Sequence, residues 1–139
     1  MEFARLELLV GVKISKIKNL KVLIIGVGGV GGYAAESLAR CGVSSITIVD
    51  YDRIDITNIN RQIIALHSTI GKKKVDVLST RIKDINPNCQ VKTYDLFIDS
   101  SNIQLIFDAD YDYILDCCDT IKSKELIIRE AIKRKIKII

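Results

Sequence analysis

The residues with the clearest potential for chemistry lie in the segment Asn58-Ile59-Asn60-Arg61-Gln62. The guanidinium of Arg61 is a forked donor that matches phosphate oxygens, and the ammonium of Lys74 adds a mobile positive charge. Together they can neutralise the negative charge that develops when an α-phosphate is attacked and pyrophosphate leaves. A site that merely holds a dinucleotide has no need of this pair. The segment therefore predicts a site at which a phosphate undergoes chemistry.

A glycine-rich segment, Gly26-Val27-Gly28-Gly29-Val30-Gly31, precedes these residues and predicts a phosphate-binding loop. It follows an expected strand and opens an expected helix, so glycines allow close approach of the backbone while the helix N-terminus supplies N–H donors. Asp50 ends the next expected strand, where its carboxylate can accept hydrogen bonds from ribose hydroxyls. These features indicate a nucleotide but do not choose between NAD and ATP.

Other polar side chains are expected at the same edge of the sheet. Asp52 follows Asp50 closely, and we expect Asn58, Arg61 and Gln62 to share one face of a short helix. Asp119 comes after the fourth expected strand, where a carboxylate can hold Mg²⁺ against nucleotide phosphates. The ordered set predicts one site around one sheet edge.

Short runs rich in Val and Ile alternate with helical patterns, as buried parallel strands do. The expected strands are residues 21–26, 45–50, 91–95, 113–116 and 136–139, and the expected helices are residues 30–41, 72–85, 102–107 and 123–134. This order predicts an α/β fold: a Rossmann-like, doubly wound, mainly parallel sheet with helices on both faces. We expect residues 1–20 to form a leading helix and connector. Residues 21–139 would form the nucleotide-binding domain, incomplete because the apolar run at 136–139 suggests truncation at the C-terminus.

Composition is that of an ordinary folded protein: 139 residues, 48% apolar and 27% charged. No apolar run is long enough for a membrane span, and the N-terminus does not resemble a signal peptide, so a cytoplasmic location is expected. The net charge of +4 is a weak indication of an anionic partner. The four cysteines form no Cys-x-x-Cys pair, which predicts packing roles and no zinc site. The single histidine, His67, is expected at a helix exit with a structural role.

The ordered motifs Gly-x-Gly-Gly-x-Gly, Asp-x-Asp, Asn-x-x-Arg-Gln, Lys and Asp resemble those of the ThiF/MoeB/ubiquitin-activating family of adenylating enzymes, over essentially the whole chain. The resemblance implies ATP and Mg²⁺ as cofactors. It implies nucleotide binding by Gly26, Gly28, Gly29, Gly31, Asp50, Asp52, Asn58 and Gln62, and catalysis by Arg61, Lys74, Asp119 and Arg5. Asp119 would hold the magnesium. Arg5 would reach the phosphates of a neighbouring subunit, which implies a homodimer.

Within that family, details are most similar to the bacterial tRNA threonylcarbamoyladenosine dehydratases, notably residues 3–11, 58–62, 65–71 and 85–87, and Asp119 with Lys124. This similarity implies ATP-dependent activation of the threonyl carboxylate of threonylcarbamoyladenosine in tRNA, then cyclisation with loss of water. The implied partners are that tRNA, a second subunit, and sulfur-transfer or redox proteins.

Three alternatives stay open. The chain could adenylate the C-terminus of a ubiquitin-like sulfur carrier protein, or serve an NAD-dependent oxidoreductase, which the glycine loop and Asp50 also permit. It could also be a non-catalytic nucleotide-binding fragment.

Overall fold

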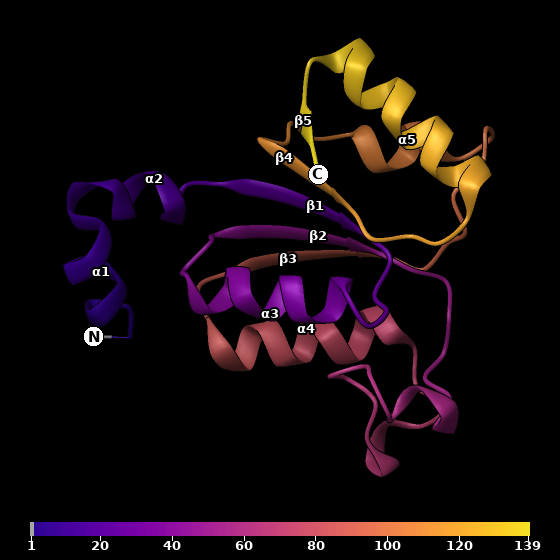
Figure 1. Ribbon diagram of the computed structural model, residues 1–139, viewed down its shortest axis with the longest axis horizontal. Coiled ribbons are helices and arrows are strands. Elements are labelled where there is room, and N and C mark those ends of the chain that lie inside the picture. Colours follow the sequence, from indigo (N-terminus) through magenta and orange to yellow (C-terminus); the bar gives the residue numbers. More distant parts are fainter. Residues whose placement is uncertain (1) are drawn as a thin grey trace.

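The computed structural model describes residues 2–139, in which one sheet of five parallel strands lies between helices (Figure 1). The strands are β1 (Lys21–Ile25), β2 (Ser45–Val49), β3 (Gln90–Tyr94), β4 (Tyr113–Asp116) and β5 (Lys137–Ile138). Their order in the sheet is β3-β2-β1-β4-β5, and every pairing is parallel. The predicted doubly wound α/β fold is confirmed.

Helices cover both faces of the sheet. Helices α3 (Gly31–Arg40) and α4 (Lys74–Ile85) lie on one face, and α5 (Ile121–Arg134) lies on the other with the 3₁₀ segment η4 (Ile103–Phe107) (Figure 1). Side chains alternate along β1 because successive residues of a strand point to opposite faces. Val22 and Ile24 pack into the core under α3 and α4, whereas Leu23 and Ile25 pack into the core under α5. A central strand buried on both faces explains the continuous apolar run in the sequence.

The residues before β1, expected as a leading helix and connector, form three short pieces. They are α1 (Ala4–Val10), η1 (Gly11–Lys13) and α2 (Ile14–Lys18). Gly11 ends α1 with a φ of 58°, a conformation that glycine adopts without steric cost. The division at residue 20 stays a prediction.

Some other expectations differ from the structure. Within the helix expected at residues 102–107, Ile103–Phe107 form a 3₁₀ helix and not an α-helix, α5 begins two residues early at Ile121, and the helix expected from residue 72 begins at Lys74. The short helix expected around Asn58 is a 3₁₀ turn, η2 (Ile56–Asn58), followed by hydrogen-bonded turns. Asp55 caps η2 by accepting the N–H of Thr57 at 2.8 Å, so the polar side chains hold a turn where we expected a regular helix.

The strand order reverses between β1 and β4, which pair with Ile25 opposite Asp116. The chain runs outward from β1 through β2 to β3, then returns to the other side of β1 to form β4 and β5. Ligands of open α/β sheets bind outside the carboxyl ends of the strands at such a switch point. Among residues 2–139, no helix is both long enough and apolar enough to cross a bilayer.

Candidate nucleotide-binding site

A cleft of about 460 Å³ lies at this switch point. Its walls come from the loop after β1, the segment after β2, the start of α4 and the turn between β4 and α5. It gathers ten of the predicted site residues: Gly26, Gly28, Gly29, Asp50, Asp52, Asn58, Arg61, Gln62, Lys74 and Asp119. Gly31 and Arg5 are not among the lining residues. The structure therefore brings most of the predicted set into one cleft.

Two glycines of the loop are required by packing within the protein. Gly26 has a φ of +93°, and a Cβ there would lie 2.5 Å from the carbonyl oxygen of Cys117. A Cβ at Gly31 would lie 1.8 Å from the carbonyl oxygen of Gly26. Both distances are impossible without moving backbone, so these glycines let the loop, α3 and the end of β4 pack directly against one another.

The other two glycines face the cleft. A Cβ on Gly28 would come no closer than 3.9 Å to another protein atom, and one on Gly29 no closer than 3.5 Å, which are ordinary contacts. The N–H groups of Gly28 and Gly29 donate to no backbone carbonyl within residues 2–139. Glycine at these two positions leaves space and free donors on the side from which a phosphate would approach.

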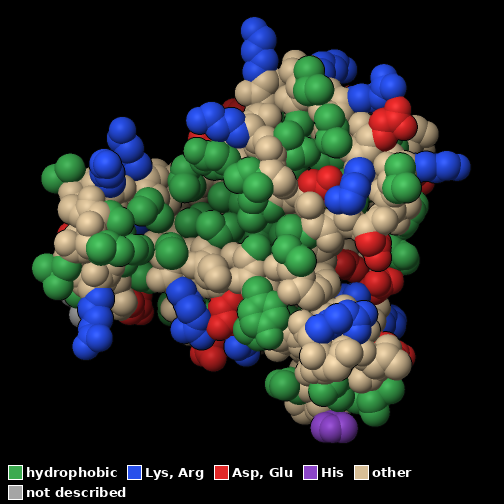
Figure 2. All heavy atoms as spheres, viewed as in Figure 1, with side chains coloured by type: hydrophobic (Ala, Val, Ile, Leu, Met, Phe, Trp, Pro, Cys, Tyr) green, Lys and Arg blue, Asp and Glu red, His purple; other side chains and the backbone are tan. Residues whose placement is uncertain are grey.

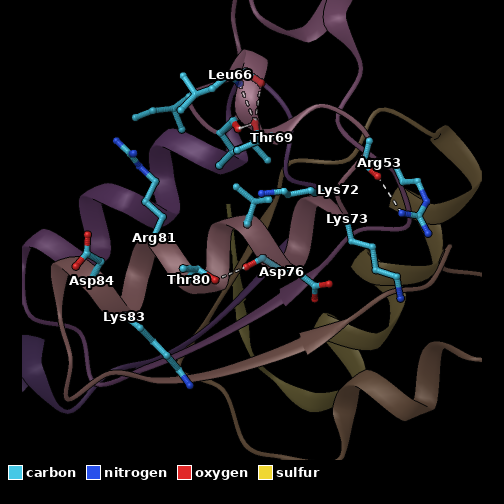
Figure 3. A pocket seen from close by; sticks show the side chains of 14 residues that line it. Arg53, Leu66, Thr69, Lys72, Lys73, Asp76, Thr80, Arg81, Lys83 and Asp84 are labelled. Atoms are coloured by element: carbon cyan, nitrogen blue, oxygen red, sulfur yellow. Dashed lines mark hydrogen bonds between the residues drawn. The ribbon is translucent and has the colours of Figure 1, made fainter.

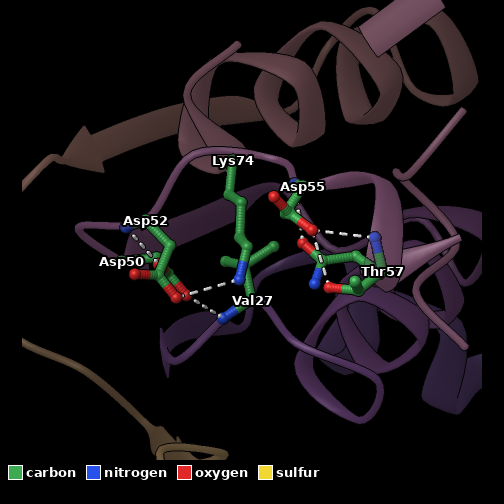
Figure 4. A network of polar contacts seen from close by, with 7 residues as sticks. Val27, Asp50, Asp52, Asp55, Thr57 and Lys74 are labelled. Atoms are coloured by element: carbon green, nitrogen blue, oxygen red, sulfur yellow. Dashed lines mark hydrogen bonds and ion pairs between the residues drawn. The ribbon is translucent and has the colours of Figure 1, made fainter. Parts of the chain in front are cut away.

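Asp50 anchors the loop from β2. One carboxylate oxygen accepts the N–H of Val27 at 2.6 Å, and the other accepts the N–H of Asp52 at 2.8 Å (Figure 4). Each carboxylate oxygen keeps a lone pair for a further donor such as a ribose hydroxyl. Asp50 therefore connects the glycine loop to the segment that carries Asp52.

Asp52 holds the lysine of the site. Lys74 Nζ lies 3.0 Å from Asp52 Oδ2 (Figure 4). Lys74 is the first residue of α4, and Asp52 is the third residue after β2. The lysine side chain is only 6% exposed, whereas the aspartate side chain is 46% exposed. The ammonium is thus buried at the cleft with one carboxylate partner.

Asn58 and Gln62 are buried amides in the cleft wall. The Oδ1 atom of Asn58 accepts the N–H of Asp55 at 2.9 Å, which leaves the amide nitrogen of Asn58 as a donor. Gln62 is 6% exposed. Its side-chain oxygen Oε1 is buried and has no hydrogen-bond partner within residues 2–139. Since buried polar atoms are normally paired, this oxygen indicates a missing hydrogen-bond donor, from a ligand or water.

Arg61 is exposed at the mouth of the cleft. Its Nη1 donates to the carbonyl oxygen of Thr57 at 3.0 Å and to Oδ1 of Asn60 at 2.8 Å. The backbone of Arg61 lies beside Gly29, at the distance of an ordinary contact. The guanidinium is therefore held near the glycine loop by neutral acceptors, and its charge is not neutralised by a carboxylate among the described residues.

The turn between β4 and α5 forms another wall of the cleft. Asp119 is exposed in this turn and lines the cleft, as do Cys117 and Cys118. Burial, followed by hydrogen bonding to Asp116, raises the pKa of the Cys118 thiol to about 12, and burial raises that of Cys117. Protonated thiols are poor nucleophiles, which agrees with the packing roles expected for these cysteines.

Magnesium fits this cleft only as a nucleotide-bound ion. Within residues 2–139 no group of three or more His, Cys, Asp or Glu side chains is arranged to hold a metal. Mg²⁺ is commonly bound by one or two carboxylates together with substrate phosphates and water. Asp119, an exposed carboxylate on the cleft wall, supplies one ligand of that type, so the donor set is compatible with Mg²⁺·ATP.

One wall of the cleft was not predicted from the sequence. It consists of Leu96, Phe97 and Ile98, which follow β3, with Tyr51 beside them. The rings of Tyr51 and Phe97 meet edge to face with centroids 5.0 Å apart. This apolar wall adjoins Asp50, the expected ribose ligand, and offers a flat base an apolar surface. Loop residues after a short strand carry no periodic signal that would place them there.

Two predicted residues lie away from the cleft. Arg5 is exposed on α1, near the amino ends of the strands, whereas the cleft lies at their carboxyl ends (Figure 1). Arg5 therefore does not reach the cleft of its own chain. His67 is exposed and begins η3 (His67–Thr69), so the expectation of a helix exit was wrong. In Figure 2 the histidine lies at the tip of an arm that projects from the sheet, among apolar side chains.

A second, larger cleft of about 940 Å³ lies on the outer side of α4 (Figure 3). It is lined by five cations and two carboxylates: Arg53, Lys72, Lys73, Arg81, Lys83, Asp76 and Asp84. Arg81 is paired with Glu36 and Lys73 with Asp95. Lys72 and Lys83 form no ion pair within residues 2–139. Arg53 and Lys73 of this cleft are the chain neighbours of Asp52 and Lys74 of the nucleotide cleft, so the same two segments contribute to both.

Comparison with known proteins places these observations in a family. Residues 4–139 match the ThiF family. The tRNA threonylcarbamoyladenosine dehydratase of Bacillus subtilis (strain 168) is 46% identical over 139 residues, which are 99% of this chain and 55% of that protein. The adenylyltransferase and sulfurtransferase UBA4 of Vanderwaltozyma polyspora is 44% identical over 112 residues, 81% of this chain and 26% of that protein.

The solved structures agree. The crystal structure of Escherichia coli tRNA N6-threonylcarbamoyladenosine dehydratase, TcdA, in complex with ATP superposes with a TM-score of 0.95 at 36% identity, covering 99% of this chain and 57% of that one. A second structure of the same enzyme contains AMP. The chain spans about half the length of the curated dehydratases it matches. The resemblance inferred from the motifs is confirmed, and the chain belongs to the ThiF family.

Proposed function

We propose that this chain carries the nucleotide-binding part of an enzyme that uses ATP to adenylate the threonyl carboxylate of threonylcarbamoyladenosine in tRNA. The observation that carries the proposal is the convergence of Arg61 and Lys74 on the cleft that also contains the glycine loop and Asp50. The ATP and AMP complexes of the TcdA relative support a cleft that binds both a substrate and a product of adenylation.

The chemistry follows from the poor electrophilicity of a carboxylate. One carboxylate oxygen attacks the α-phosphate of ATP, the bond to the bridging oxygen breaks, and pyrophosphate leaves. The resulting acyl adenylate has AMP as its leaving group. A nitrogen of the carbamoyl group then attacks the acyl carbon, loses its proton and displaces AMP, which carries away the former carboxylate oxygen. The ring product is the starting nucleoside less one water.

We assign the residues of the cleft to these steps. Gly28 and Gly29 offer free N–H donors to the phosphates, and Asp50 accepts from the ribose. Arg61 and Lys74 place positive charge where negative charge grows as pyrophosphate leaves. Asp119 holds Mg²⁺, which when bound supplies further charge neutralisation at the phosphates.

The remaining polar residues of the cleft support these steps. Asp52 orients Lys74, and Asn58 and Gln62 complete the polar wall. Gly26 and Gly31 act through the shape of the loop, because protein atoms fill the space beside them.

Arg5 and the partners form a further part of the proposal. Arg5 lies far from the cleft of its own chain, so it can serve a phosphate only in a neighbouring subunit, which requires a homodimer. Close to Arg5 in the chain, the apolar residues Leu8, Leu9 and Val12 are 82–91% exposed. Their exposure supports a subunit interface at this end of the molecule. We further propose a cytoplasmic location, where tRNA and ATP are both present, and sulfur-transfer or redox proteins as additional partners.

A second candidate function is adenylation of the C-terminus of a ubiquitin-like sulfur carrier protein. It is favoured by the 44% identity to a UBA4 protein whose name describes adenylyl and sulfur transfer. The first steps would be the same, since the carboxylate would again attack the α-phosphate. The two functions differ in the carboxylate that the cleft receives and in the step that follows the acyl adenylate.

The test is exchange of labelled pyrophosphate into ATP, measured with two carboxylate substrates. The proposed function predicts exchange that depends on tRNA containing threonylcarbamoyladenosine and is absent with a sulfur carrier. Arg61→Ala should slow the exchange by about two to three orders of magnitude, as expected for loss of a transition-state donor. Arg129→Ala, which removes an exposed arginine on α5 outside the cleft, is the control and should retain most of the rate. Exchange with the sulfur carrier alone would establish the second candidate instead.

A further inference from the structure

An ion pair outside the cleft joins the two ends of the turn that carries Asp119. Lys124 Nζ lies 3.1 Å from Asp116 Oδ1. Asp116 is the last residue of β4, and Lys124 lies in the first turn of α5. Neither residue is among those that line the nucleotide cleft, whereas Asp119, which lies between them in the sequence, is.

The carboxylate of Asp116 connects Lys124 to the start of the turn. Its side chain is 9% exposed, and the same oxygen that binds Lys124 also accepts the backbone N–H of Cys118 at 3.3 Å and its thiol at 3.1 Å. A carboxylate that is this buried is costly unless it is paired and hydrogen-bonded. Lys124 supplies the one positive charge found beside it in residues 2–139.

The turn between these residues has little other support. Residues 117–120 belong to no helix or strand. At its start, the N–H of Cys117 donates to the carbonyl of Ile25 at 2.8 Å, and at its end the N–H of Lys124 donates to the carbonyl of Thr120 at 3.0 Å. Asp119 lies between these two anchors and is itself exposed. The direction of its carboxylate thus depends on how the ends of the turn are fixed.

We propose that Lys124 is a positioning residue that, through Asp116, directs the carboxylate of Asp119 at the nucleotide-bound divalent cation. This inference rests on the proposed function, in which Asp119 is the protein ligand of that cation. Lys124 touches neither nucleotide nor metal in this account. Removing the charge of Lys124 leaves Asp116 buried without its cationic partner, and the turn shifts to hydrate it.

The experiment measures the affinity of Mn²⁺, used as a probe for Mg²⁺, in the presence of a saturating non-hydrolysable ATP analogue. Electron paramagnetic resonance of free Mn²⁺ gives the dissociation constant. Residues that support a metal ligand from outside the coordination sphere typically contribute about 10- to 100-fold in metal affinity. We expect Lys124→Met to raise the dissociation constant by about 10-fold or more, with unchanged affinity for the analogue in EDTA.

Two variants separate positioning from a general loss of structure. Lys124→Arg keeps a cation beside Asp116 and should restore the Mn²⁺ affinity. Lys122→Met removes an exposed lysine two residues away on the same helix, which forms no ion pair within residues 2–139, and should change nothing. If Lys124→Met does not fold, Lys124→Gln replaces it, with the same weakening expected relative to Lys124→Arg.

The outcomes distinguish this inference from the proposed function. Asp119→Asn should weaken Mn²⁺ at least as much as Lys124→Met. If Asp119→Asn weakens Mn²⁺ and Lys124→Met does not, the positioning role is overturned while the role of Asp119 stands. If neither variant changes the dissociation constant, the role assigned to Asp119 is overturned as well, and the inference with it.

Discussion

Lys74 Nζ and Asp52 Oδ2 lie 3.0 Å apart, and the backbone N–H of Lys74 also donates to the carbonyl of Asp52 at 3.1 Å. The double connection fixes the start of α4 against the segment that follows β2. It also places a buried positive charge at the nucleotide cleft before any phosphate arrives. A cation held in place in advance needs little reorganisation when negative charge develops beside it.

This relationship predicts that Asp52→Asn destabilises the protein, because the buried ammonium loses its charged partner. We expect a loss of about 1–3 kcal/mol in the free energy of unfolding, measured by urea denaturation. Saturating ATP should recover part of it, since a phosphate can replace the lost carboxylate. Asp95→Asn is the matched control: it removes the partner of Lys73 in an exposed pair, for which we expect a clearly smaller loss of stability. Equal stabilities of the two variants would contradict the account.

Substitutions at different glycines of the loop should affect either ATP binding or folding. Gly29→Ala should fold with an unchanged melting temperature, because its Cβ meets only ordinary contacts, yet ATP affinity should fall because the methyl group occupies the phosphate side of the loop. Gly26→Ala should fail to fold or melt far below the wild type, since its Cβ would lie 2.5 Å from a carbonyl oxygen. Calorimetry measures the ATP affinity of each variant, and thermal melting measures its stability. Undiminished ATP binding by Gly29→Ala would show that the phosphates do not lie against this loop.

A pH dependence is predicted from Glu36. The hydrogen bond from Arg81 lowers the pKa of the carboxyl below its usual value of 4.5, against an opposing effect of burial, and Arg40 lowers it further. Because the folded-state pKa is the lower one, the stabilisation is present above the unfolded-state pKa and is lost as the pH falls through the folded-state pKa.

Arg81→Met should therefore reduce the loss of stability on acidification between about pH 5 and pH 3. The measurement is the free energy of unfolding of wild type and variant across that range. Other carboxyl groups titrate alike in the two proteins, so the difference reports on Glu36. Parallel curves for the two proteins would show that Arg81 has no effect on the ionisation of Glu36.

The cleft outside α4 gives a prediction about RNA. Lys72 and Lys83 line this cleft and have no carboxylate partner within residues 2–139. If tRNA is the substrate, Lys72→Glu with Lys83→Glu should weaken its binding, with a shallower dependence on salt because fewer phosphates are neutralised. Lys133→Glu with Lys137→Glu, on α5 and β5 and outside both clefts, is the control of equal charge. Equal losses in both double variants would indicate general electrostatics without a specific surface.

The sequence was sufficient to predict the strands of the sheet and most of the residues that line the nucleotide cleft. Val- and Ile-rich runs between helical patterns predicted all five strands, because a strand buried on both faces tolerates little else. Gly26, Gly28, Gly29, Asp50 and Asp119 lie at one edge of the sheet, as the order of the motifs predicted, since parallel strands present their carboxyl ends together.

What the sequence could not provide depends on tertiary contacts. Lys74 was expected to face phosphate, but its pairing with Asp52 joins segments that only the packing of α4 brings together. Phe97 lies in a loop without periodicity, so its position in the cleft had no local signal. The connection between Asp116 and Lys124 likewise depends on how α5 returns over β4.

Calorimetric binding of ATP·Mg²⁺ and, separately, of NAD to this chain, repeated with Arg61→Ala, distinguishes an adenylating site from a dinucleotide site. We expect that ATP·Mg²⁺ binds, that NAD does not, and that Arg61→Ala weakens binding of ATP. Binding of NAD without ATP would contradict this expectation and would assign the glycine loop and Asp50 to a dinucleotide.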